Sequence, residues 1–151
     1  MQKIKIYLDN CAYNRPFDDQ SQIRIALETD AKRYIQQLIV EKKVDLVHSF
    51  INRFENSKNK RLLNKNSIND FFKNASLYIS HINASNIEKR AIKIMEANIK
   101  TRDAYHIACA IEGRCSYFIT TDKQLLKYNQ QEIIICNPVQ FLDYYEEAKN
   151  E

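Results

Sequence analysis

The sequence predicts an α/β fold, a three-layer arrangement in which helices cover both faces of a central, mainly parallel sheet. Two observations predict it. Short apolar runs alternate along the chain with longer segments of helical periodicity. The 151 residues include one glycine and two prolines, which favours long regular elements over many turns. Hydrophobic residues make up 44% of the chain, enough for one core, so we expect residues 1–151 to form a single domain.

The expected strands are short runs rich in β-branched and aromatic residues. These runs are Ile4–Leu8, Asp45–Ser49, Tyr117–Thr120 and Glu132–Cys136. Leu77–Ile82 is ambiguous between an extended segment and the end of a helix.

The expected helices show apolar residues at helical spacing. They cover residues 21–42, 67–75, 83–98, 102–112 and 123–128, with a short one around Phe50–Glu55 and a last one that opens at Pro138. One face of the first carries Ile23, Leu27, Ala31, Tyr34, Ile35, Leu38 and Ile39. Thr101 is the expected cap of helix 102–112. The segment after Asp9 is expected to be a polar, turn-rich loop, and Asn56–Asn66 is expected to be a solvated connection.

Acidic residues follow the predicted strands. Asp9 comes directly after the first strand, Glu55 a few residues after the second, and Asp122 two residues after the strand that ends at Thr120. The carboxyl ends of parallel strands meet at one edge of a sheet, where sites of this fold class lie. Asp103 joins that edge if its helix runs antiparallel to the following strand, as a crossover helix does. We therefore expect the four acids to meet.

Carboxylates that share one pocket repel one another, and a hard divalent cation such as Mg²⁺ or Mn²⁺ removes that cost. Such a cation also polarises phosphoryl oxygens and activates water. The acid cluster therefore predicts metal-dependent phosphodiester hydrolysis. The net charge of +4 is compatible with an anionic partner. Basic residues that could hold a nucleic-acid backbone are Arg15, Lys58, Lys60, Arg61, Lys100, Arg102 and Lys123.

Each of these acids also has an ordinary explanation, as a turn former, a helix cap or a residue favoured by the helix dipole. Their coincidence at one edge is what favours a site. His106 shares a helix face with Asp103, and we expect it to be a packed, hydrogen-bonded residue rather than a metal ligand. Cys11 has no base partner and is not expected to act as a nucleophile. The acids expected on the surface are Asp18, Asp19, Glu28 and Asp30.

Several other classes of protein are disfavoured. Gly113 is the sole glycine, so there is no glycine-rich phosphate loop. Cys11 stands where a phosphoaspartate phosphatase needs its second Asp, and the second strand ends in His48 and Ser49 where a receiver domain needs an Asp. The sequence shows no apolar run of transmembrane length and no signal-peptide pattern. Four scattered cysteines without a CxxC pair indicate reduced thiols and a cytoplasmic protein.

Four segments resemble the PIN domain family in order and spacing: YLDNCAYNRPFDD, FINRFENSKN, KTRDAYHIACAIEGRCSYFITTD and ICNPVQF. The most specific part is RDAYHIACAIEGRCSYFITTD. The resemblance implies an α/β/α fold and an Mg²⁺- or Mn²⁺-dependent ribonuclease that leaves 5′-phosphate and 3′-hydroxyl ends. Many single-domain members are toxins of VapBC-type pairs, dimeric and blocked by an antitoxin.

Residue by residue, the resemblance implies that Asp9, Glu55, Asp103 and Asp122 are the catalytic, metal-binding acids. Thr120 corresponds to the Ser or Thr that precedes the last acid. Two positions depart from the pattern. Asn10 stands where many members have Thr or Ser, and Gln124 where some carry a further acid, which puts a full second metal site in doubt.

These observations together predict an endoribonuclease with an RNA substrate, an Mg²⁺ or Mn²⁺ cofactor, a possible antitoxin partner and a homodimeric state. The alternative is a non-catalytic PIN-fold module that binds RNA or protein. A pure nucleic-acid binder gains nothing from a negative pocket, which argues against it. A DNA nuclease of the flap-endonuclease kind is less favoured, because the chain lacks the appendages of those enzymes.

Overall fold

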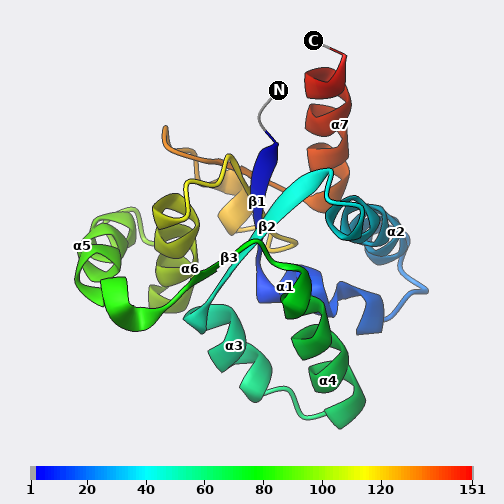
Figure 1. Ribbon diagram of the computed structural model, residues 1–151, viewed down its shortest axis with the longest axis horizontal. Coiled ribbons are helices and arrows are strands. Elements are labelled where there is room, and N and C mark those ends of the chain that lie inside the picture. Colours follow the sequence, from blue (N-terminus) through cyan, green and yellow to red (C-terminus); the bar gives the residue numbers. More distant parts are fainter. Residues whose placement is uncertain (1–2, 151) are drawn as a thin grey trace.

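The computed structural model describes residues 3–150 and has a sheet at its centre with helices on both sides (Figure 1). The sheet has the strand order β3-β2-β1-β4-β5, and its neighbouring strands are all parallel. The strands are β1 (Ile4–Leu8), β2 (Val44–Ser49), β3 (Leu77–Ile79), β4 (Tyr117–Ile119) and β5 (Ile134–Cys136). The predicted α/β fold is confirmed. The ends of the predicted domain, residues 1–2 and 151, lie outside the described residues.

Seven α-helices accompany the sheet in residues 3–150. They are α1 (Asn10–Asn14), α2 (Ile23–Val40), α3 (Phe50–Ser57), α4 (Leu62–Phe71), α5 (Ala84–Met95), α6 (Thr101–Glu112) and α7 (Pro138–Lys149). One core joins β1 and β2 to α1, α2, α4 and α7, and the other joins β1, β2 and β4 to α5 and α6. Figure 1 shows α5 and α6 on one side of the sheet and α2 and α7 on the other. None of the described helices is long and apolar enough to cross a membrane.

The central strand β1 is apolar except at Lys5, and its last three residues are fully buried. Ile6 and Leu8 belong to the core under α2 and α7, and Tyr7 belongs to the core under α5 and α6. Alternate residues of a strand point to opposite faces, so the part of a strand that is covered on both sides needs consecutive apolar residues. Asp9 follows these buried residues directly, at the carboxyl edge of the sheet.

Helix α6 runs from the carboxyl edge of the sheet to the edge where the strands begin. Its C-terminal end lies near the start of β1, where Lys5 Nζ donates to Gly113 O at 3.3 Å. A Cβ atom on Gly113 would lie 2.9 Å from Val47 Cγ1, so the absence of a side chain lets α6 approach β2. The helix therefore runs antiparallel to the strands, and its first turn brings Asp103 to the carboxyl edge.

The burial of α2 differs from the prediction. Only part of its predicted apolar face is buried, because Ile23, Leu27 and Tyr34 are exposed. Glu28 is buried instead, so its predicted surface position is wrong. The physical reason is that Arg15 and Arg24 both form ion pairs with its carboxylate.

Some element boundaries also differ. The predicted loop after Asp9 is helical, with α1 followed by a 3₁₀ turn at Arg15–Phe17. The predicted connection at Asn56–Asn66 is mostly helix, because α3 continues to Ser57 and α4 begins at Leu62. The cap of α6 is Lys100 rather than Thr101. The ambiguous segment supplies the edge strand β3.

Candidate active site

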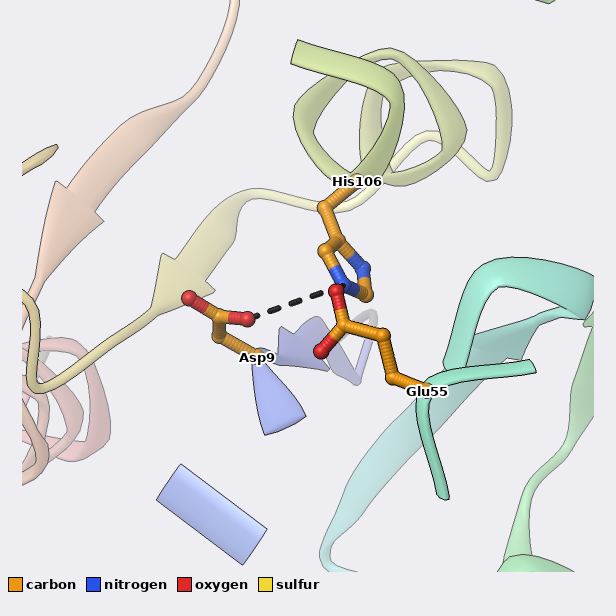
Figure 2. A group of neighbouring side chains, drawn as sticks. All are labelled: Asp9, Glu55 and His106. Atoms are coloured by element: carbon orange, nitrogen blue, oxygen red, sulfur yellow. Dashed lines mark hydrogen bonds and ion pairs between the residues drawn. The ribbon is translucent and has the colours of Figure 1, made fainter. Parts of the chain in front are cut away.

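The predicted acids gather beyond the carboxyl ends of β1, β2 and β4. The tightest group in the described chain consists of Asp9, Glu55 and His106, whose ligand atoms all lie within 4.8 Å of one another. Figure 2 shows these side chains converging from the end of β1, from α3 and from α6. Asp9 and His106 are buried, and Glu55 is partly exposed.

Asp9 is held by neutral donors. Thr120 Oγ1 donates to Asp9 Oδ2 at 2.9 Å, and Cys11 Sγ donates to the same oxygen at 3.3 Å. Thr120 Oγ1 also accepts the backbone N–H of Asp122 at 3.1 Å. One hydroxyl thus links the first and last acids. Burial, followed by the charge of Asp9, raises the pKa of the Cys11 thiol to about 12, which keeps it protonated as a donor.

Asp103 and Asp122 lie outside the tightest group and line a cleft of about 590 Å³ with Lys100 and Lys127. Asp122 Oδ1 accepts the backbone N–H of Gln124 at 2.8 Å. Burial, followed by the nearby charges of Asp9 and Asp122, raises the pKa of Asp103 to about 6. This is the expected behaviour of carboxylates that share a pocket without a counter-ion.

Glu55 borders a second cleft. Its Oε1 accepts from His106 Nε2 at 2.8 Å and lies 3.8 Å from Arg102 Nε. The cleft, of about 480 Å³, is also lined by the basic residues Lys58, Lys60 and Arg61. The predicted acids therefore border two clefts, one at Glu55 and one at Asp103 and Asp122, and each cleft is also lined by basic side chains.

A buried polar cluster, which sequence reasoning missed, fixes the position of α3. Ser49 Oγ accepts from the N–H groups of Ile51 and Asn52, and Asn52 Oδ1 accepts the N–H of Ser49 at 2.9 Å. Asn52 Nδ2 donates to Leu8 O and Asn10 Oδ1, which ties α3 to the end of β1. The Ser-x-x-Asn spacing is a capping box and is the one local signal that could have indicated it.

Asn10, a departure from the family pattern, belongs to the same cluster, since its Nδ2 donates to Asn52 O at 3.0 Å. Glu55 lies three residues after Asn52 on α3, so fixing Asn52 also fixes the turn that carries Glu55 beside Asp9.

His106 is fully buried, and both ring nitrogens are hydrogen-bonded. Nδ1 lies 2.5 Å from Tyr7 Oη, and Nε2 lies 2.8 Å from Glu55 Oε1. Burial alone would lower the pKa of His106, but the Glu55 hydrogen bond and the charges of Asp9, Glu55 and Asp103 outweigh it and raise the pKa. The packed, hydrogen-bonded histidine expected from the sequence is what the structure contains.

Not every predicted basic residue lies at the clefts. Arg15 is directed away, because it pairs with Asp18 at 3.0 Å and Glu28 at 3.2 Å. Arg102 stays at the rim, where its guanidinium lies 5.6 Å from the centre of the Phe54 ring.

The donor set fits a divalent hard cation. Asp9 and Glu55 offer carboxylate oxygens within the tightest group, and Asp103 and Asp122 add two more from the neighbouring cleft. Burial, followed by the charges of Asp9 and Asp122, raises the pKa of Asp103. Mg²⁺ and Mn²⁺ prefer such oxygen ligands together with water. The arrangement can therefore hold a cation at the junction of two clefts that suit an anionic chain.

The comparisons with known proteins concern the family and the fold. A family model described as the PIN domain matches residues 23–130. This range includes Glu55, Asp103, Thr120 and Asp122 and begins after Asp9. No curated protein matches the chain.

Six solved chains are similar in structure. One comes from the crystal structure of VapBC2 from Rickettsia felis bound to a DNA fragment from their promoter. It shares 15% sequence identity, with 89% of this chain and 98% of that chain covered and a TM-score of 0.54. At this identity the likeness shows the fold.

Proposed function

Because the chain belongs to the PIN domain family, we propose that it is a metal-dependent endoribonuclease and the toxin of a toxin–antitoxin pair. The observation that carries the proposal is the convergence of Asp9 and Glu55 within 4.8 Å of His106, with Asp103 close enough that the charges of Asp9 and Asp122 raise its pKa. A domain that only binds nucleic acid has no use for such a concentration of negative charge.

In this proposal Asp9, Asp103 and Asp122 hold the main Mg²⁺ or Mn²⁺ ion, and Glu55 supports the ion or its water. The bound cation supplies Lewis-acid polarisation of a phosphoryl oxygen and lowers the pKa of a water molecule. The chain itself supplies orientation, since Thr120 holds Asp9 Oδ2 and the backbone N–H of Asp122.

The basic residues of the two clefts would bind the RNA backbone on either side of the acids. Lys58, Lys60 and Arg61 lie on the Glu55 side, and Lys100 and Lys127 lie on the Asp103 side. Such phosphate contacts are independent of sequence and weaken with salt.

The test is cleavage of labelled structured and unstructured RNA with Mg²⁺ or Mn²⁺ and with EDTA. We expect wild type to cleave only with metal, and Asp9→Asn and Asp122→Asn to lose at least about 100-fold of that rate, as removal of a group central to charge stabilisation does. Asp70→Asn, at an exposed position that pairs with Lys73, is the matched control and should cleave like wild type. Retained cleavage in both site variants would remove these acids from the mechanism. Metal-independent RNA binding without turnover would favour the non-catalytic module.

The toxin assignment is supported by the family and by exposed apolar side chains beside the Glu55 cleft. Phe54 on α3 and Leu62 and Leu63 on α4 are exposed, a surface that a protein antitoxin would cover. We expect the product of a neighbouring gene to bind this protein and to block cleavage. Co-expression followed by the cleavage assay tests this, and an isolated gene with no inhibitor beside it would count against the toxin role.

The proposal also includes a homodimer and a cytoplasmic location. The four cysteines are free thiols, which supports a reducing compartment. Light scattering of the purified protein measures the oligomeric state, and a monomer at micromolar concentration would remove the dimer from the proposal.

A further inference from the structure

We propose that His106 is a positioning residue for Glu55 rather than a metal ligand, and that Tyr7 and Ser49 fix its orientation from behind. The inference rests on the proposed function, because it assigns Glu55 a task at the cation site. Figure 2 shows the imidazole reaching from α6 toward the two carboxylates of Asp9 and Glu55.

The hydrogen bonds behind His106 have a direction. Ser49 Oγ accepts the N–H groups of Ile51 at 3.2 Å and Asn52 at 3.3 Å, so its own proton is available for Tyr7 Oη at 2.6 Å. Tyr7 Oη then donates its proton to His106 Nδ1 at 2.5 Å. With Nδ1 as acceptor, the neutral imidazole carries its proton on Nε2.

The proton on Nε2 is directed at Glu55. Nε2 lies 2.8 Å from Glu55 Oε1, and an ionised carboxylate can only accept. If the ring is doubly protonated, Nδ1 donates to Tyr7 and Nε2 still donates to Glu55. In both protonation states Nε2 is a donor, so the nitrogen that faces the acids has no lone pair to offer a cation.

A fixed donor at this point has a specific consequence for Glu55. The side chain is partly exposed and has three rotatable bonds, so it would otherwise sample the Arg102 side of its cleft, 3.8 Å away. The same Nε2 lies 3.7 Å from Asp9 Oδ1, between the two carboxylates. His106 therefore holds Glu55 beside Asp9 and reduces the repulsion between them.

Binding of Mn²⁺ without RNA measures this role directly. Groups that orient metal ligands change metal affinity by about 10–100-fold when they are replaced. We expect His106→Leu to weaken Mn²⁺ binding by about 10-fold or more. His106→Gln, whose amide can donate to Glu55 and accept from Tyr7, should recover most of the loss. Thermal unfolding in EDTA identifies variants that have lost their fold.

A double-substitution test separates positioning from ligation. If His106 acts through Glu55, His106→Leu should change Mn²⁺ affinity by less than about 2-fold in a Glu55→Ala background, because coupled residues are not additive. Losses that multiply in the double variant, or no rescue by His106→Gln, would overturn the proposal.

Tyr7→Phe provides a milder perturbation with a matched control. Tyr7 and Tyr13 are both buried, but the Tyr13 hydroxyl has no hydrogen-bond partner among residues 3–150. Tyr7→Phe should weaken Mn²⁺ binding several-fold and Tyr13→Phe should leave it unchanged. Equal effects of the two substitutions would mean that Tyr7 contributes only to packing.

A spectroscopic measurement keeps this inference separate from the proposed activity. The ¹⁵N resonances of the His106 ring in the metal-free protein should show a protonated Nε2. A neutral ring protonated at Nδ1 overturns the proposal even if RNA is cleaved. Mn²⁺ binding with the expected variant effects, but without RNA cleavage, would contradict the ribonuclease and retain the role of His106. A wild type that binds no Mn²⁺ would overturn both.

Discussion

Replacing Glu28 by glutamine tests whether a buried charge stabilises the segment that leads to Asp122. Glu28 has a side chain only 3% exposed, and its oxygens lie 3.2 Å from Arg15 Nη2 and 3.4 Å from Arg24 Nη2. Arg24 Nη2 also donates to Thr121 O at 2.7 Å. The two arginines thus connect α2 to the 3₁₀ turn before it and to the residue that precedes Asp122.

The magnitude follows from burial. Removing one partner of a buried ion pair costs about 3–5 kcal/mol, because the remaining charge is left unpaired. Arg24 is 39% exposed, so solvent screens part of that cost. We therefore expect Glu28→Gln to lower the free energy of unfolding by about 2–3 kcal/mol. For a chain of this length that corresponds to a fall of about 4–12 °C in the melting temperature.

Urea unfolding of Glu28→Gln and of Glu132→Gln measures the difference. The Arg90–Glu132 pair is shorter, at 2.6 Å, but its side chains are 35% and 55% exposed. An exposed pair contributes less than about 1 kcal/mol, so Glu132→Gln should be nearly silent. If the two variants lose the same stability within about 0.5 kcal/mol, burial does not strengthen the Glu28 pairs and the reasoning is refuted.

Three further predictions concern α6, Thr120 and α2. Gly113→Ala should destabilise the fold by about 1–3 kcal/mol in urea unfolding, because the new Cβ meets Val47 Cγ1 at 2.9 Å; a Val47→Ala background that does not reduce this loss would contradict the steric reason. Thr120→Val should weaken Mn²⁺ binding about 10-fold by removing the donor to Asp9, whereas Thr120→Ser should bind like wild type; loss in Thr120→Ser with wild-type binding in Thr120→Val would point to the methyl group instead. Burial, followed by the charge of Arg33, lowers the pKa of Lys32 from 10.5 to about 8. Between about pH 8 and pH 10.5 the unfolded chain therefore binds more protons than the folded protein, so wild type becomes more stable as the pH rises through this range. Lys32→Met should therefore be more stable than wild type by roughly 2 kcal/mol at pH 7, with the difference shrinking from pH 8 to 10.5, and a difference that is independent of pH would refute the assigned cause.

The strands and the acids at their ends could be predicted from the sequence because both signals are local. The part of a strand that is covered on two faces is apolar, as Ile6–Leu8 is, and the first acid after it marks the carboxyl edge. The same holds for Glu55 and Asp122, which follow their strands within a few residues.

The remaining features depend on partners that are distant in the sequence. Burial of Glu28 requires Arg15 from the preceding turn, and a helical pattern read by hydropathy assigns such an acid to the surface. The contact between Tyr7 and Ser49 spans 42 residues, and that between Tyr7 and His106 spans 99. No periodicity within one element can indicate pairs of this kind, so the orientation of His106 needed the structure.

The chemistry of the restraining groups argues for different tasks among the acids. Asp9 is held by a hydroxyl and a thiol, and Asp122 by the backbone N–H of Gln124. Such donors fix an oxygen without cancelling the charge of the carboxylate. Glu55 instead accepts from His106, with Arg102 at 3.8 Å, so more of its charge is balanced by the protein.

A divalent cation gains most from carboxylates whose charge is not already neutralised by a fixed partner. The aspartates at the ends of β1 and β4, together with Asp103, therefore suit direct ligation, and Glu55 suits a supporting position. Glu55→Gln should accordingly weaken Mn²⁺ binding less than Asp9→Asn does in the same titration. The reverse order would mean that Glu55 is a principal ligand and that its hydrogen bond to His106 strengthens ligation rather than orienting a supporting group.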